Sequence, residues 1–306
     1  MVPNGARSDR TFNIVNISIM IILIILTVYP FYFSIINSLN DGTDLRRGPI
    51  LLWPRLFRFD SWAKVLSDAT LIKAEMITLS RTIIVTVVQI LNTAIFTYAF
   101  SRPYLKFKKF YVAVGFISMY FPGALIPTFI LYNWLGIYDT YWVYILPILV
   151  GNFFNVIIFN ANYKAIPDAL FESAKMDGAN EFKIFFSIVL PLSKSVIAAI
   201  SVFVAVWIWN DYGTTLFFTQ NSNLQTLQYY ILKLIMSNAG ADQLSSAASQ
   251  NADIAQLAIQ ARGIGKTTAE TIQLAAMVIA SIPMLIMYPF AQKFFIKGVL
   301  LGSVKG

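Results

Sequence analysis

The residues with the clearest chemical signal lie in one polar segment, ESAKMDGANEFKIFFSIVLP, which runs from Glu172 to Pro191. Gly178 stands where a helical pattern would otherwise continue, and a glycine at such a place marks a turn with positive φ or a close backbone approach. We therefore predict two short helices that meet at a bend. Pro191 ends the segment, as prolines do where a helix breaks. The segment is therefore predicted to be a protruding loop with a defined shape.

The composition argues against most enzyme classes. The chain has no Cys and no His, which removes thiol chemistry, disulfides, imidazole bases and the commonest metal ligand. Of its 306 residues, 57% are hydrophobic and 12% are charged. In soluble domains, by contrast, about a quarter of the residues are charged. The sequence therefore predicts an integral membrane protein with no metal site.

Uncharged runs predict an all-α, polytopic membrane protein with six transmembrane helices, which form a single domain over residues 1–306. Each run is long enough to cross about 30 Å of hydrocarbon as a helix of about 20 residues. The polar segment must then leave the membrane and return to it, within a loop at residues 163–192 between spans four and five. A long loop at 213–270 precedes the last span. The predicted spans are 12–36, 81–100, 110–134, 140–162, 193–212 and 271–292.

Lys and Arg residues predict the orientation, because they concentrate in cytoplasmic loops. One side of the predicted membrane holds 13 of the 23 basic residues but only five of the 15 acidic ones. Both termini and the 163–192 loop lie on that side, so we place them in the cytoplasm and the 213–270 loop outside. The pI of about 9.5 then reflects topology, and no nucleic-acid partner is needed to explain it.

The polar segment resembles the signature of the membrane subunits of ABC importers. That signature is Glu-Ala-Ala, a Gly four residues after the last Ala, and an ending with Ile, Leu and Pro. The fuller form IPDALFESAKMDGA, from Ile166, is similar to the carbohydrate-uptake branch of the type I importers. Ser173 and Ser195 depart from the usual Ala and Pro, but neither changes the charge. The matching residues are Glu172, Ser173, Ala174, Gly178, Ile188, Leu190 and Pro191.

The resemblance implies a role for each part of this loop. In the family the acid that opens the signature pairs with basic groups in a cleft of an ATPase subunit, and the glycine permits the bend. Outside this context an isolated Glu172 would be interpreted as a solvated side chain. The residues that we assign to ATPase coupling are Glu172, Ser173, Ala174, Met176, Asp177, Gly178, Ile188, Leu190 and Pro191.

The same resemblance implies the other components. No ATPase motif is present, so two ATPase subunits are expected to bind ATP and Mg and to supply hydrolysis, while this chain binds no cofactor. A second permease subunit, expected to be a different chain, completes the pore. An extracytoplasmic solute-binding protein delivers the substrate. We therefore predict a permease subunit, not an enzyme, in a bacterial plasma membrane, which imports a carbohydrate and most readily an oligosaccharide.

The sequence WIWNDYG, residues 207–213, is a candidate for the substrate pathway. Sugar rings stack on aromatic faces and sugar hydroxyls pair with amides, so Trp207, Trp209 and Asn210 are the candidate contacts. An interfacial aromatic belt is an equally good interpretation, because Trp and Tyr commonly form one. The resemblance adds only that similar sequences recur here in sugar permeases.

Two further segments contain glycines. The tail KGVLLGSVKG resembles the ends of carbohydrate permeases, some of which reach between the ATPase subunits, and its candidate contacts are Gly302, Lys305 and Gly306. The alternative is a frayed basic terminus. The sequence RGIGKTT, residues 262–268, lacks the first glycine of a phosphate-binding loop, because Gln260 occupies that position. We interpret it as the approach to the sixth span.

Other functions stay open on the sequence alone. An ABC permease for a peptide, an amino acid or phosphate is the nearest alternative. A secondary carrier would need ionisable groups near the bilayer centre, and the predicted spans have almost none, with Asp211 at a boundary. A membrane-embedded enzyme such as a glycosyltransferase would need catalytic groups or an acidic metal site that the sequence lacks.

Overall fold

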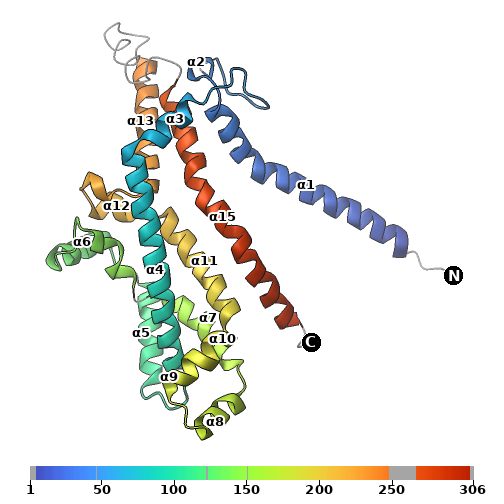
Figure 1. Cartoon of the computed structure of the whole chain (residues 1–306), viewed down its shortest axis with the longest axis vertical. Helices are drawn as coiled ribbons and strands as arrows, with labels where there is room; N and C mark the ends of the chain where they lie inside the picture. The colour runs from blue at the N-terminus through green and yellow to red at the C-terminus, as the bar shows by residue number, and fades with distance from the viewer. Residues whose placement is uncertain (1–4, 46, 122, 150, 248–266, 304–306) are drawn as a thin grey trace. The chain divides into compact units, whose positions relative to one another are not determined.

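The computed structural model describes residues 5–45, 47–121, 123–149, 151–247 and 267–303. Apart from one isolated bridge between Asn40 and Phe57, these residues form helices, turns and irregular segments, which confirms the all-α prediction for the described part of the chain. The longer α-helices (Figure 1) are α1 (Gly5–Ser38), α3 (Asp60–Ser67), α4 (Ala69–Ser101), α5 (Lys108–Tyr120), α6 (Leu125–Trp134), α7 (Phe153–Lys164), α8 (Asp168–Met176), α11 (Lys194–Asn210), α13 (Leu227–Ala247) and α15 (Ala269–Ser303). The short ones are α2 (Gly42–Leu45), α9 (Glu181–Ile184), α10 (Leu190–Leu192) and α12 (Gly213–Phe218).

The chain divides into two compact units. The first comprises residues 1–69 and 231–281, and the second comprises residues 70–230 and 282–306. The polar segment predicted to couple to an ATPase and the candidate substrate path both belong to the second unit. All contacts described below lie within one unit or the other.

Three helical stretches are each long and apolar enough to cross a membrane alone, namely Phe12–Ser38, Ala69–Ser101 and Ala269–Pro289. They correspond to the first, second and sixth predicted spans, although α4 begins well before the expected residue 81. The third and fourth predicted spans correspond to pairs of helices joined at a bend, and the fifth corresponds to α11, the second member of the bent pair Glu181–Leu192 and Lys194–Asn210. If each bent pair is one crossing, the described residues provide up to six spans.

The third and fourth predicted spans are not single straight helices. α5 and α6 meet at 111°, and the sequence FPGA between Phe121 and Ala124 contains the proline and glycine that end a helix. The fourth span begins with two short 3-10 helices, Tyr141–Tyr144 and Leu146–Ile148, and turns by 45° into α7. Gly151 lies at that turn with φ +80, a conformation that suits glycine. The apolar pattern predicted where the third and fourth spans lie in the sequence, but it did not predict that their helices are interrupted.

The core of the second unit lies between α4, α7 and α11. Val85, Phe159 and Ile208, one from each helix, are fully buried. α5 joins this core at Gly115, where an added Cβ would lie only 2.3 Å from the ring of Phe153. Close helix contacts through small residues are typical of membrane proteins, because packing rather than the hydrophobic effect joins helices in lipid. The packed core therefore fixes the ends of α4 and α11 relative to each other.

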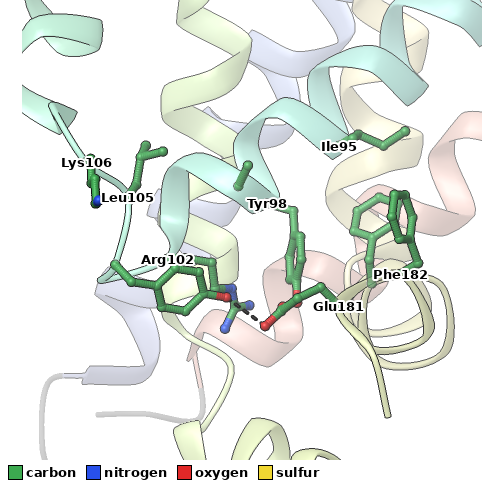
Figure 2. A pocket seen from close by; sticks show the side chains of 10 residues that line it. Ile95, Tyr98, Arg102, Leu105, Lys106, Glu181 and Phe182 are labelled. Atoms are coloured by element: carbon green, nitrogen blue, oxygen red, sulfur yellow. Dashed lines mark hydrogen bonds between the residues drawn. The ribbon is translucent and has the colours of Figure 1, made fainter.

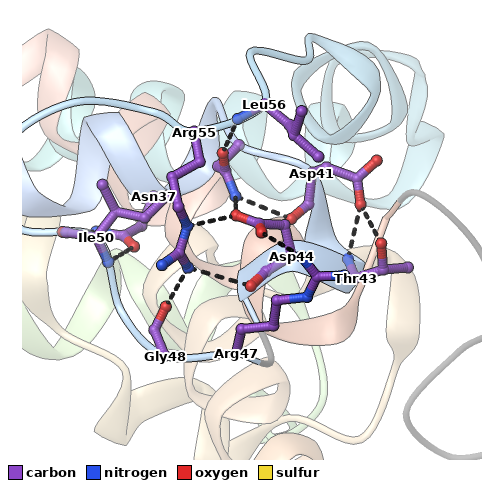
Figure 3. A network of polar contacts seen from close by, with 10 residues as sticks. Asn37, Asp41, Thr43, Asp44, Arg47, Gly48, Ile50, Arg55 and Leu56 are labelled. Carbon is purple, nitrogen blue, oxygen red and sulfur yellow. Dashed lines mark hydrogen bonds and ion pairs between the residues drawn. The ribbon is translucent and has the colours of Figure 1, made fainter.

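A polar network shapes the segment after α1 in the first unit (Figure 3). The Asn37 amide donates to the carbonyl oxygen of Ile50 at 2.9 Å and accepts from its backbone nitrogen at the same distance. Arg55 lies 2.7 Å from the Asp44 carboxylate and donates to the Gly48 carbonyl. Hydrogen bonds from Arg55 and Asn40 hold the pKa of Asp44 below its ordinary value. The network fixes a turn that exposes the apolar side chains of Leu51, Leu52, Trp53, Leu56 and Phe57.

Candidate coupling site

The bend predicted at Gly178 is present. α8 ends at Met176, Gly178 has φ +74, and α9 begins at Glu181. The Asn180 side chain caps α9 by accepting a hydrogen bond from the Lys183 backbone nitrogen at 2.8 Å. An added Cβ at Gly178 would meet no heavy atom within 4 Å. The positive φ, and not a lack of space, is therefore what requires glycine here, which confirms the sequence prediction.

The chain continues from α9 to α11 through a helical run that is not a regular α-helix throughout. A π-helical turn covers Phe185–Val189, α10 follows, and the helical run from Glu181 to Leu192 meets α11 at 78°. The corner is Ser193, which is buried, and Pro191 lies two residues before it within α10. π-Helical turns are rare and often occur at functional positions. The proline thus precedes the corner rather than forming it.

The predicted coupling residues differ in exposure. Glu172, Met176 and Asp177 are exposed, and Met176 is 89% accessible. Ala174, Ile188 and Leu190 are half-buried and pack against the core. The two ends of the signature also meet, because they border one hollow of about 380 Å³ between α8 and the π-helical turn. The hollow is lined by Leu170, Ser173, Ala174, Asp177, Ser187, Ile188, Pro191 and Leu192.

A carboxylate that the sequence analysis missed anchors this loop to α4 (Figure 2). Glu181 accepts hydrogen bonds from the hydroxyls of Tyr98 at 2.5 Å and Tyr104 at 2.7 Å, and the Lys175 ammonium lies 3.0 Å away. Figure 1 shows α8, α9 and α10 beside the C-terminal end of α4. The only sequence signal was a pair of tyrosines around Arg102, because these partners are far from Glu181 along the chain.

The electrostatic environment keeps Glu181 ionised. Burial alone would raise its pKa, but the hydrogen bonds from Tyr98, Tyr104 and Lys175 outweigh burial and lower the pKa from 4.5 to about 2. A lowered carboxyl pKa stabilises the folded state above the unfolded pKa, and this stabilisation is lost as the pH falls through the folded value. The anchor is therefore complete at neutral pH and weakens between about pH 4.5 and pH 2.

We expect Glu181→Gln to loosen the loop and lower the free energy of unfolding of the second unit by about 1 kcal/mol at neutral pH. The value is modest because the carboxylate is 43% exposed and solvent screens the ion pair. Thermal unfolding of the purified subunit would measure it. The matched control is Asp177→Asn, which removes an exposed acid from the same loop. The difference between wild type and Glu181→Gln should shrink as the pH falls from about 4.5 toward 2, and a difference as large at pH 2 as at pH 7 would contradict the anchoring role.

A buried ion pair joins α4 to the end of α11. Arg81 is fully buried, and its guanidinium pairs with the Asp211 carboxylate directly after α11. The ring of Tyr144 lies 4.8 Å from the guanidinium carbon, and the Thr214 backbone nitrogen donates to Asp211 at 3.2 Å. Asp211 was expected at a span boundary and residue 81 at the start of the second predicted span, but 130 residues separate the two charges, so their pairing was not predicted.

The structure separates the three candidate substrate contacts. Trp207 is 60% exposed and Asn210 is also exposed, one turn apart on the same face of α11. Trp209 is 2% exposed and belongs to the interior of the second unit. The Asn210 side-chain amide donates to the Val206 carbonyl oxygen at 2.8 Å, which leaves its oxygen available. Only Trp207 and Asn210 are therefore presented at the surface of this chain.

Other predicted segments lie partly or wholly outside the described residues. Gly302 belongs to the last turn of α15, whereas Lys305 and Gly306 are outside the described range. Most of the RGIGKTT sequence, residues 262–266, is also outside it. Within the described ranges, no group of three or more acidic, His or Cys side chains is placed to hold a metal ion.

The fold and this loop define a helical, multi-span membrane protein with a bent loop fixed to its core. Over residues 91–301 the chain matches the family of the binding-protein-dependent transport system inner membrane component, and it belongs to that family. "Protein LplC" of Bacillus subtilis (strain 168) is 34% identical over 303 residues, which are 99% of this chain and 98% of that protein. The polygalacturonan/rhamnogalacturonan transport system permease protein YtcP of the same organism is 34% identical, with 97% and 99% covered.

Among solved structures, a bacterial ABC transporter involved in the import of the acidic polysaccharide alginate is similar. It has a TM-score of 0.82 and 26% sequence identity, and 96% of this chain and all of that chain are covered. These matches confirm the family that the polar segment indicated. The family is the membrane component of a transport system, so this chain is a transport subunit and not an enzyme.

Proposed function

We propose that this chain is the membrane-spanning permease subunit of an ATP-driven importer for an oligosaccharide. The relative YtcP is a polygalacturonan/rhamnogalacturonan transport system permease and the similar solved transporter is involved in the import of the polysaccharide alginate, and both support this substrate class. The family description supports delivery by a binding protein, and the signature supports ATP hydrolysis with Mg on two separate ATPase subunits. The observation that carries the proposal is the bent Glu172 to Pro191 loop on the core of the second unit.

The proposed orientation places both termini and this loop in the cytoplasm, with six spans. The excess of Lys and Arg on that side supports it, as do the three long apolar helices and the three bent pairs. The binding protein and the loop at 213–270 then face the other side. A second permease subunit, which we expect to be a different chain, completes the pathway.

In the proposed mechanism, the exposed face of α8 seats in an ATPase subunit. Glu172 is the group that meets basic side chains of the ATPase, and Met176 adds apolar contact. ATP-driven closure of the two ATPases draws the coupling loops together. The half-buried Ile188 and Leu190 pack against the core, so the displacement passes through the corner at Ser193 into α11. The permease then opens to the outside and receives the oligosaccharide.

The proposal is tested by reconstituting the complex with its ATPases and binding protein in vesicles. We expect uptake of labelled oligogalacturonides or alginate oligosaccharides to need internal ATP and the binding protein, and to be unaffected by proton and sodium ionophores. Neutral oligosaccharides tested in parallel define the preferred charge of the substrate. Uptake that runs without ATP and collapses with an ionophore would identify a secondary carrier instead.

The exposed face of α11 gives a specific prediction. If Trp207 and Asn210 contact the passing sugar, each alanine variant should lose about 1 kcal/mol of contact, which is about a fivefold lower uptake per assembled complex. Trp209→Ala should instead reduce the yield of folded complex, because that ring is buried. Trp142→Ala, which removes an exposed ring from the same unit, is the control. Unchanged uptake in Trp207→Ala and Asn210→Ala would remove this face from the pathway.

A further inference from the structure

A second hollow of the second unit lies at the cytoplasm-facing end of α4 in the proposed orientation (Figure 2). Its volume of about 330 Å³ is within the range of small-molecule sites. Ile95 and Tyr98 from α4, with Arg102 directly after that helix, form one wall, and Glu181 and Phe182 form the opposite wall. The remaining lining is Ala99, Tyr104, Leu105, Lys106 and Phe185, so most of the surface is apolar.

Arg102 is the unusual member of this lining. It is only 8% exposed, and its guanidinium carbon lies 3.9 Å from the centre of the Phe171 ring and 4.3 Å from that of Tyr98. Across the described part of the chain, no carboxylate oxygen lies within 4.0 Å of the guanidinium nitrogens, and Nε has no hydrogen-bond partner. Buried charges are normally paired, because desolvation without a partner is costly. The site therefore lacks an anion.

Glu181 is not that anion, although it lines the same hollow. Its carboxylate is already occupied by two tyrosine hydroxyls and the Lys175 ammonium. Lys106 lies on the lining as a second cation, and it is exposed. The hollow thus combines two available positive charges with an apolar interior. An occupant that complements it has an anionic group next to a hydrocarbon chain.

The geometry points to an anionic phospholipid as this occupant, with its phosphate at Arg102 and Lys106 and part of one acyl chain in the hollow. α4 is long and apolar enough to cross a membrane, and Arg102 directly follows its last residue. Basic pockets at the cytoplasmic ends of membrane helices suit such headgroups. Phe182, 72% exposed at the wall, extends apolar surface toward a lipid chain. Because the hollow lies between α4 and α9, the lipid would join the coupling loop to the membrane.

The inference rests on the proposed function only in placing the hollow on the cytoplasmic side of the membrane. Its test measures lipid binding and not transport. Native mass spectrometry of the purified complex would measure retention of dioleoyl phosphatidylglycerol against dioleoyl phosphatidylcholine, with inorganic phosphate as a third probe. We expect the wild type to prefer phosphatidylglycerol by at least about fivefold. If the proposed function is wrong, the uptake experiment fails and lipid retention is unaffected. If this inference is wrong, the preference for phosphatidylglycerol is absent and uptake is unaffected.

Three variants locate the site. Lys106→Gln should weaken the preference for phosphatidylglycerol about fivefold, whereas Lys109→Gln, an equal charge change outside the lining, should not. Ala99→Trp fills the hollow with both cations kept, and it should abolish retention in complex that still assembles. Equal retention of the two lipids, or no difference among the variants, overturns the inference. Binding of inorganic phosphate without a preference between the two lipids also overturns it. If a variant loses the ATPase subunits while its lipid retention is unchanged, the hollow is a contact for another protein, and the inference is overturned as well.

Discussion

We expect Gly178→Val to abolish uptake while the chain remains inserted in the membrane. The backbone at Gly178 has φ +74, where a β-branched side chain is strained by about 1–3 kcal/mol. The variant should relieve this strain by changing the bend between α8 and α9, which misdirects the face that seats in the ATPase. Uptake by the reconstituted complex and co-purification of the ATPase subunits measure the effect.

Gly178→Asn is the matched control, because asparagine tolerates positive φ and no heavy atom would crowd its Cβ. It should retain most of the uptake. Reversing a charge in the same element is a second test: Glu172→Lys should prevent ATPase binding, because it places a like charge against the basic side chains of the ATPase. Normal uptake in both Gly178→Val and Glu172→Lys would show that the loop does not couple to an ATPase.

Asp211→Asn should destabilise the second unit by about 3–5 kcal/mol, because it leaves the fully buried Arg81 without its partner charge. We expect little folded complex from this variant and a correspondingly low temperature of unfolding. The double variant Arg81→Met with Asp211→Leu removes both charges, and it should be more stable than Asp211→Asn. Thermal unfolding of the purified subunit measures the coupling in a double-mutant cycle, which adds the single variants Arg81→Met and Asp211→Leu.

A double variant whose destabilisation equals the sum of the two single effects would contradict a direct interaction. A complex that folds normally but transports slowly in Asp211→Asn would instead assign the pair to the transport cycle. Both outcomes are distinguished by comparing unfolding with uptake per assembled complex.

Local signals in the sequence predicted local structure well. Gly178 interrupts a helical pattern, and the backbone there has the positive φ that such an interruption indicates. Apolar runs predicted where long helices occur, because burial in lipid requires a continuous apolar helix of about 20 residues. The breaks near Gly123 and Gly151 were not predicted, although both contain residues that end helices. A hydropathy pattern reports how apolar a segment is and not whether it is straight.

Contacts between distant residues could not be predicted from one sequence. Glu181 meets Tyr98 and Tyr104, and Arg81 meets Asp211, only because the core brings α4 beside the coupling loop and α11. The candidate substrate residues show the same limit. Side chains two positions apart on a helix point in different directions, so Trp209 is buried while Trp207 is exposed. Residue type suggested a sugar contact, but only the packing shows which ring is presented.

We propose above all that the Glu172 to Pro191 loop lies in the cytoplasm and seats in an ATPase subunit. Because the chain has no cysteine, Met176→Cys introduces a unique thiol at a side chain that is 89% exposed. We expect a membrane-impermeant maleimide to label it in inside-out vesicles and not in intact cells. Bound ATPase subunits should protect it, and a short bifunctional reagent should link it to one of them. Labelling from the outside, or equal labelling with and without the ATPase subunits, would contradict this placement of the loop.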